Sequence, residues 1–235
     1  MHIFTELVYP LKCPNCDIIL HKNEKTVGFC RNCAKNIKLA TGNICLRCGK
    51  LVAGNMEYCD TCQSRNHSFD KGRGIYVYTG NIKKAMYKFK YSNKRYYSRA
   101  FANQAIKIHG NWLNNEKFDA IVPVPMYREK EKRRGYNQAE TFARSLSEKT
   151  GIPIAKDIIR REIVTVPMKE LNYASRQSNL QKAFKLSENS VKYNQLLVVD
   201  DIYTTGSTMD AVAELLKKAG VKRVCCLSVC IGEMD

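Results

Sequence analysis

The spacing of apolar positions changes near residue 74 and divides the chain into two unlike parts. Beyond that point, short apolar runs suited to buried strands alternate with stretches whose apolar residues recur every three or four positions, as in helices. Strands are predicted at 74–78, 120–124, 196–199 and 223–229, and helices at 81–90, at 137–149 and around 209–216, with Gly220 after the last of them. This alternation indicates an α/β fold with a parallel sheet and right-handed crossovers.

The first part of the chain is marked by cysteine instead. Eight of the eleven cysteines form four CxxC pairs: Cys13 and Cys16, Cys30 and Cys33, Cys45 and Cys48, Cys59 and Cys62. Four thiolates complete a tetrahedral, closed zinc site, so the four pairs predict two structural zinc ions. Disulfides are disfavoured because no export signal precedes the pairs. Sequential pairing, favoured by the short loops, gives two stacked ribbons; interleaved pairing gives a cross-braced module.

We expect residues 1–66 to form this double zinc-ribbon module and residues 67–235 to form the α/β domain. The module has few large apolar residues, so metal is expected to supply most of its folding energy. His21 and His67 are expected at the surface, because four thiolates already fill each site. The remaining cysteines, Cys225, Cys226 and Cys230, fall on or just after the last strand and are expected to be buried as small hydrophobes.

Charge points to an anionic partner. The net charge is +17, and residues 71–140 alone carry 16 basic and 5 acidic residues. Nucleic acid, acidic lipid or a phosphorylated ligand would each fit such an excess. No apolar run is long enough to suggest a membrane span, so we expect a cytoplasmic protein, or a peripheral one at the inner face of a membrane.

Residues 83–99 combine basic and aromatic side chains without an acidic one. Such a surface suits single-stranded DNA, whose bases stack on aromatic rings and whose phosphates attract cations. The alternative is a solvated helix face with Met86 and Phe89 turned inward. Lys130, Lys132 and the two arginines that follow extend the basic surface and favour DNA slightly. The candidate DNA-binding residues are Lys83, Lys84, Tyr87, Lys88, Tyr91, Lys94, Arg95 and Arg133.

Residues 196–208, LLVVDDIYTTGST, carry the most specific chemistry. A buried strand ends in Asp200 and Asp201, and a turn opens directly into a helix, whose free N–H groups bind phosphate. Gly206 permits close approach of an anion, and hydroxyls come from Thr204, Thr205, Ser207 and Thr208. The adjacent carboxylates suit sugar hydroxyls or a hydrated cation, so a ribose 5-phosphate satisfies both ends. A simple helix cap or an unrelated Mg²⁺ site are the alternatives.

This segment resembles the phosphoribosyl pyrophosphate signature of type I phosphoribosyltransferases: four apolar residues, two acids, an aliphatic residue, then Thr-Thr-Gly-x-Thr. With the four CxxC pairs, VPVPM at 122–126, RRGYNQAE at 133–140 and SRQSNLQKAF at 175–184, nearly the whole chain resembles the ComF family. That family joins a zinc ribbon to a phosphoribosyltransferase-type domain and is associated with natural competence and the use of external DNA.

The resemblance implies roles for individual residues. Asp200 and Asp201 would contact the ribose hydroxyls and the Mg²⁺ shell, and residues 204–208 would hold the 5-phosphate. Residues 123–125 would form the pyrophosphate-side turn, and residues 133–137 would open a mobile hood. Lys90, Arg134 and Arg176 would also bind the substrate, with Asn179 completing an Arg-x-x-Asn element. Thr165-Val166-Pro167-Met168 departs from the family's Thr-x-x-Gln.

The function expected from these features is a phosphoribosyl pyrophosphate-binding, phosphoribosyltransferase-like protein that supports competence or DNA uptake and binds single-stranded DNA. The alternative is an active phosphoribosyltransferase on an unidentified acceptor, since no segment identifies a base or amine nucleophile. A third hypothesis makes the zinc ribbons a docking surface for a competence helicase or a membrane channel.

Overall fold

A four-stranded parallel sheet forms the centre of the molecule. The computed structural model describes residues 10–25, 28–162, 183–187 and 192–233. The strand order is β1 (Lys71–Val77), β6 (Arg223–Ile231), β5 (Gln195–Tyr203) and β2 (Ala120–Pro123), and every neighbouring pair is parallel. These four strands confirm the predicted ones, each with slightly different ends. Their nearly continuous burial is typical of a sheet covered on both faces.

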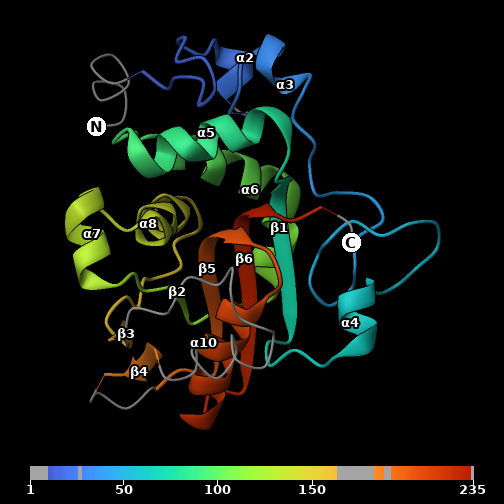
Figure 1. The fold of residues 1–235 in the computed structure, drawn as a ribbon, viewed down its shortest axis with the longest axis vertical. Coiled ribbons are helices and arrows are strands. Elements are labelled where there is room, and N and C mark those ends of the chain that lie inside the picture. Colours follow the sequence, from blue (N-terminus) through green and yellow to red (C-terminus); the bar gives the residue numbers. More distant parts are fainter. Residues whose placement is uncertain (1–9, 26–27, 163–182, 188–191, 234–235) are drawn as a thin grey trace.

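Helices cover both faces of the sheet (Figure 1), and each face has its own core. On β5, Leu197 and Val199 point into a core built with α5 (Gly80–Tyr91), α6 (Tyr97–Asn115) and α8 (Gln138–Thr150). Leu196 and Val198 point the other way, into a core built with α10 (Ser207–Lys218). Alternate residues of a strand face opposite sides of the sheet, so the two apolar sets cannot merge.

In the described part of the α/β domain, four elements were not predicted. These are α6, α7 (Arg128–Arg134) and an antiparallel pair, β3 (Ile159–Arg161) with β4 (Phe184–Leu186). Helix α6 buries polar side chains, including Gln104 and His109, and His109 Nε2 lies 2.8 Å from the Gly74 carbonyl oxygen of β1. These polar positions interrupt the apolar periodicity from which a helix is predicted.

The two zinc ribbons wrap different parts of the α/β domain. The first, with α2 (Lys22–Lys25) and α3 (Arg31–Ala34), lies over α5 and α6, and the second, with α4 (Asp60–Ser64), lies beside β1 (Figure 1). The linking residues 38–40 pair antiparallel with β1 through Ala40 N–H to Ile75 at 3.0 Å and Val77 N–H to Lys38 at 2.9 Å. On the far edge, residues 153–155 pair with Ile121 of β2. Both outer strands of the sheet are therefore covered.

Each ribbon shares one of the two cores. Cys13, Leu20 and Phe29 join the core of α5, α6 and α8, whereas Cys45 and Cys48 join the core of α10. Packing is therefore continuous across residue 66, and the division of the chain there stays a prediction. The late cysteines are buried, as expected: Cys225, Cys226 and Cys230.

Asp17 joins the first ribbon to the domain. It follows the Cys13–Cys16 pair with a φ of 63°, in the left-handed region. Its carboxylate accepts hydrogen bonds from Lys88 Nζ at 2.8 Å, Tyr97 at 2.5 Å and Tyr96 at 3.1 Å. Lys94 Nζ lies 3.4 Å from it. Burial acts to raise the pKa of Asp17, but the bonds from Lys88 and Tyr97 outweigh this and hold the pKa well below its usual range.

Replacing Asp17 by asparagine tests this contact, because the size is kept and the charge is lost. Hydrogen bonds to charged groups contribute about 1.5–3 kcal/mol. Since the Asp17 side chain is 32% exposed, we expect a loss of about 1.5 kcal/mol of unfolding free energy at pH 7, measured by denaturant titration. Because the folded pKa is depressed, the loss should shrink as the pH falls through the folded pKa.

Glu57→Gln, an exposed substitution in the second ribbon, provides the matched control and should change the free energy of unfolding little. Equal stabilities of the Asp17 variant and this control at pH 7 would show that the contact does not hold the ribbon.

Candidate functional site

The predicted phosphate loop lies at the carboxyl end of β5, which runs on to Tyr203 and so contains both acids. Residues 204–206 turn the chain, and α10 begins at Ser207. Gly206 is the N-cap, with a φ of 81°. A Cβ there would lie 2.5 Å from the Tyr203 hydroxyl oxygen and 3.0 Å from Cε1 of His67, so only glycine fits.

The loop presents hydroxyls and backbone amides together. Thr205 Oγ1 and Ser207 Oγ lie 3.0 Å apart, Thr204 is exposed and Thr208 is half-buried. Glycine at the N-cap offers no side-chain oxygen to the amides of the first turn of α10. Those N–H groups have no intrahelical partner, and the helix dipole favours negative charge beside them. The geometry thus matches an anion-binding loop.

The two carboxylates are held differently. Asp201 Oδ2 lies 2.9 Å from Lys90 Nζ, and both side chains are largely buried. Asp200 Oδ1 accepts the Asp201 backbone N–H at 2.7 Å. Burial, and then the carboxylate of Asp201, raises the pKa of Asp200 to about 7. Burial acts to lower the pKa of Lys90, but Asp201 and Asp200 outweigh it and raise that pKa.

A basic cavity of about 330 Å³ opens beside these acids, lined by Lys90, Tyr91, Lys130, Arg133 and Arg134. Arg134 donates to the Tyr91 hydroxyl at 3.1 Å and to Gln138 Oε1 at 2.9 Å, and its guanidinium lies 4.8 Å from the Tyr91 ring centroid. Partial burial, together with Arg134 and Arg161, lowers the pKa of Lys130. Lys90 lines the cavity and pairs with Asp201, so it connects the cations to the acids.

Arg161 of β3 is a charged neighbour of Asp200 that was missed in the sequence. Burial lowers the pKa of Arg161, and the negative charge of Asp200 acts against that. The sequence offers one sign of it, two arginines directly after an apolar pair. However, the strand that carries Arg161 has only three residues, which is too short to show a periodic pattern.

Part of the RRGYN motif serves the fold. Gly135, with a φ of 82°, ends α7, and Tyr136 is buried and donates to the Phe89 carbonyl. Asn137 caps α8 by accepting from the Ala139 N–H at 3.0 Å, and it donates to the Val124 carbonyl at 3.0 Å. Among the predicted substrate-binding residues, Arg176 lies outside the described residues, as do Asn179 and residues 165–168.

The structure places the predicted DNA-binding residues in three different environments. Lys88 and Lys94 pair with Asp17, and Arg95 donates to the Gly135 carbonyl at 2.6 Å while lying 4.8 Å from the Tyr136 ring. By contrast, the outer face of α5 is exposed and carries Lys83, Lys84, Tyr87 and Tyr91. The tyrosines are 64% and 59% exposed, with ring centroids 5.0 Å apart. Arg133 lines the basic cavity.

The eight early cysteines gather into two groups, Cys13, Cys16, Cys30 and Cys33, and then Cys45, Cys48, Cys59 and Cys62. Sulfurs of each group lie within 4.8 Å of one another, and Cys16–Cys30 and Cys48–Cys59 are 3.6 Å apart. A tetrahedron with Zn–S bonds of about 2.3 Å has edges of about 3.8 Å, so both groups fit zinc. Sequential pairing is confirmed.

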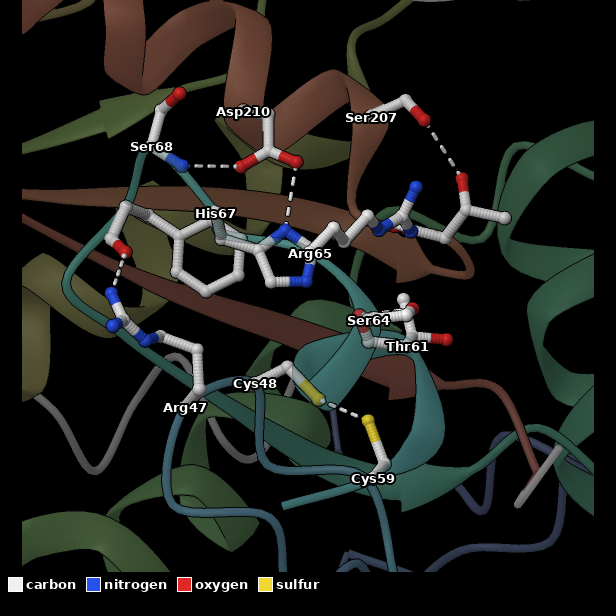
Figure 2. Close-up of polar contacts among 12 residues, drawn as sticks. Arg47, Cys48, Cys59, Thr61, Ser64, Arg65, His67, Ser68, Ser207 and Asp210 are labelled. Carbon is white, nitrogen blue, oxygen red and sulfur yellow. Dashed lines mark hydrogen bonds and ion pairs between the residues drawn. The ribbon is translucent and has the colours of Figure 1, made fainter. Parts of the chain in front are cut away.

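His67 is buried, so its expected surface position was wrong. Its Nδ1 lies 2.8 Å from Asp210 Oδ2, and the Ser68 N–H donates to Asp210 Oδ1 at 2.8 Å (Figure 2). Arg65 Nη2 donates to the Thr205 carbonyl at 2.5 Å. The segment leaving the second ribbon therefore contacts the phosphate loop. Its partners lie more than 130 residues later in the chain, which is why local patterns did not reveal it.

In the part of the chain that the structure describes, no helix combines the length and apolarity needed to cross a membrane.

The sequence matches two family models. These are "Double zinc ribbon domain" over residues 4–63 and "Phosphoribosyl transferase domain" over residues 93–233. Both matches agree with the expected order of the two parts.

Similar proteins align over most of the chain. "Competence protein F" of Haemophilus influenzae is 31% identical over 221 residues, which cover 92% of this chain and 95% of that protein. "DNA utilization protein YhgH" of Salmonella typhimurium is 26% identical, covering 84% and 87%. "Competence protein ComFC" of Bacillus subtilis is 26% identical, covering 86% and 82%. The chain therefore belongs to the phosphoribosyl transferase domain family and, within it, to the ComF family of competence proteins.

Proposed function

We propose that this protein binds phosphoribosyl pyrophosphate with Mg²⁺ and supports the uptake or processing of DNA in natural competence. One observation carries the proposal: the phosphate loop, the carboxylates of Asp200 and Asp201, and the basic cavity adjoin one another at the carboxyl end of the sheet. Open α/β sheets bind their ligands there. The names of the relatives support the competence role.

The three parts correspond to the three parts of the ligand. The 5-phosphate would lie on the amides and hydroxyls of residues 204–208, and the ribose hydroxyls would face Asp200 and Asp201. The pyrophosphate would enter the cavity between Lys90 and Arg134. Carboxylate oxygens are the ligands that Mg²⁺ prefers, and the ion would supply charge neutralisation to the pyrophosphate.

The same arrangement supports a second candidate, phosphoribosyl transfer to an unidentified acceptor. Five cations near the acids, namely Lys90, Lys130, Arg133, Arg134 and Arg161, would stabilise the charge that develops on departing pyrophosphate. Pyrophosphate release that depends on an added nucleobase or amine would identify transfer. Slow release with water alone, unaffected by any acceptor, would favour ligand binding without transfer.

A DNA-binding role is supported by the outer face of α5. Tyr87 and Tyr91 form an exposed aromatic pair on which bases can stack, and Lys83 and Lys84 flank it. Tyr91 also lines the basic cavity, which extends the positive surface towards Arg133. We place the protein in the cytoplasm, where a competence helicase or membrane channel could hand over a single strand.

The cysteine groups predict two zinc ions per purified chain. Because each ribbon shares a core with the α/β domain, chelation should lower the melting temperature of the whole chain rather than release residues 10–66 alone. Elemental analysis and calorimetry before and after chelation measure both effects. Protein without zinc, with the eight cysteines paired as disulfides, would contradict the assignment.

The raised pKa of Asp200 predicts opposite effects on stability and on ligand binding. The pKa of this carboxyl is 3.8 in the unfolded chain but about 7 in the folded one. The cost of burying its charge therefore lowers the free energy of unfolding more and more as the pH rises between these two values. Asp200→Asn should therefore raise the melting temperature at pH 8 by several degrees, at about 2–4 °C per kcal/mol, and by little at pH 4.

The same variant should bind phosphoribosyl pyrophosphate with Mg²⁺ at least about tenfold more weakly, about 1.4 kcal/mol, by titration calorimetry. Wild-type affinity should fall as the pH drops below about 7, because the proton competes with the ligand. Affinity that is independent of pH and of this substitution would place the ligand elsewhere.

The exposed face of α5 predicts binding of single-stranded DNA. Lys83→Glu with Lys84→Glu should weaken it about tenfold and reduce the salt dependence, whose slope is about −0.7 per neutralised phosphate. Tyr87→Ala with Tyr91→Ala should weaken it by about 1–3 kcal/mol per stacked base with the salt slope kept. Lys88 and Lys94 are left unchanged because they hold Asp17.

The matched control reverses the charge of two other lysines, by Lys107→Glu with Lys149→Glu. These two line a different cavity, together with Lys25, Asn103 and Ile106. Fluorescence anisotropy should show wild-type DNA affinity for this control. If both charge reversals weakened DNA binding equally, DNA would be held by the overall positive charge of the protein and not by the outer face of α5.

A further inference from the structure

The segment that leaves the second zinc ribbon contacts the phosphate loop and the first turn of α10. Residues 65–69 run from α4 to β1, past the turn between β5 and α10 (Figure 2). Neither the ComF resemblance nor the loop signature accounts for these contacts. They join parts of the chain about 140 residues apart.

Asp210 is an acidic residue close to the proposed anion site, and His67 contacts it. Its carboxylate lies in the first turn of α10, where its negative charge would oppose the binding of an anion nearby. His67 Nδ1 at 2.8 Å and the Ser68 N–H at 2.8 Å occupy the two carboxylate oxygens. The His67 side chain is fully buried, and its Cε1 would lie 3.0 Å from a Cβ on Gly206. The imidazole therefore ties down Asp210 and packs directly against the backbone of the loop.

Arg65 fixes the orientation of a peptide unit in the loop. It donates to the Thr205 carbonyl at 2.5 Å. In a trans peptide, the carbonyl of one residue and the N–H of the next point in opposite directions. With the Thr205 carbonyl held on the ribbon side, the Gly206 N–H points away from the ribbon, towards the side where a phosphate would bind.

The zinc site is close to this segment. Arg47, between Cys45 and Cys48, donates to the Phe69 carbonyl at 3.1 Å, and His67 stacks on Phe69 with ring centroids 4.6 Å apart. The Gly72 N–H donates to the Arg47 carbonyl at 2.6 Å. A Cβ on Gly72 would lie 2.8 Å from the Cys48 carbonyl oxygen, so the cysteine turn and the start of β1 meet backbone to backbone.

We propose that His67 and Arg65 are positioning residues for the phosphate loop, and that the second zinc site acts on ligand affinity through them. The inference rests on the proposed phosphoribosyl pyrophosphate site. The first ribbon contacts a different part of the domain, through Asp17 to α5 and α6. The two zinc sites therefore have different effects: the second one orders the loop.

His67→Phe tests the positioning role, because the ring can still stack on Phe69 while the bond to Asp210 is lost. His67→Asn is the conservative variant, since its amide can donate near the position of Nδ1 and restore the bond. His109→Phe is the matched control: His109 is also buried and bonds the Gly74 carbonyl at 2.8 Å through Nε2, away from the loop.

Hydrogen exchange on the full-length, zinc-loaded protein without ligand provides a readout independent of phosphosugar binding. Amides of residues 204–208 should exchange at least about tenfold faster in His67→Phe than in wild type, about 1.4 kcal/mol in local opening. His67→Asn and His109→Phe should match wild type at these amides. Unchanged exchange in His67→Phe would overturn the proposal.

Titration with phosphoribosyl pyrophosphate and Mg²⁺ provides the second readout. We expect about tenfold weaker binding by His67→Phe and affinities within about twofold of wild type for the other two variants. Failure of the wild type to bind would reject the proposed function, while the exchange result would still decide the positioning role. Equal affinities of His67→Phe and His109→Phe would overturn the positioning role.

Arg47→Gln tests the zinc side without removing a thiolate. It should keep two zinc ions by elemental analysis, yet increase the exchange of residues 204–208 severalfold, because the bond to the Phe69 carbonyl is lost. Retained zinc with unchanged exchange in this variant would overturn the connection between the second zinc site and the loop.

Discussion

The burial of two adjacent carboxylates at the end of β5 is the constraint on which the rest of this structure depends. Buried negative charge requires cations nearby or protonation, and Asp200 and Asp201 have both: a raised pKa on one and Lys90 on the other. Helix α5 brings Lys90 to them and, from another face, sends Lys88 to Asp17 of the first ribbon. One helix thus provides a lysine partner both for a carboxylate of the candidate site and for a carboxylate of the first zinc ribbon.

The zinc ribbons are consequently part of the domain's architecture. Thiols of the first ribbon complete the core beneath α5 and α6, and thiols of the second complete the core beneath α10. The two cores lie on opposite faces of the sheet. Closed four-thiolate zinc sites are structural and have no open coordination position for a reaction, so their contribution to the proposed ligand site is to hold nearby segments in place.

Local sequence was enough to predict the four strands of the parallel sheet, the cysteine groups and the strand–turn–helix unit at residues 196–208, because each depends on neighbours within a few residues. It did not reveal α6, whose buried Gln104 and His109 mask the helical spacing. It also placed His67 at the surface, because its partner Asp210 is 143 residues away. The basic stretch at 83–99 was recognised, but its division between Asp17 and the outer face of α5 depends on tertiary packing.

The covered edges of the sheet have a consequence for assembly. Residues 38–40 pair with β1 near its end, the Arg47 carbonyl takes the N–H of Gly72 near its start, and residues 153–155 occupy the far edge at β2. A partner that adds a strand needs a free row of backbone donors and acceptors. Along these covered stretches such a partner would first have to displace the protein's own segments. A protein partner that leaves these segments in place would have to use other surfaces, and the same protection guards a strongly apolar sheet against edge-to-edge aggregation.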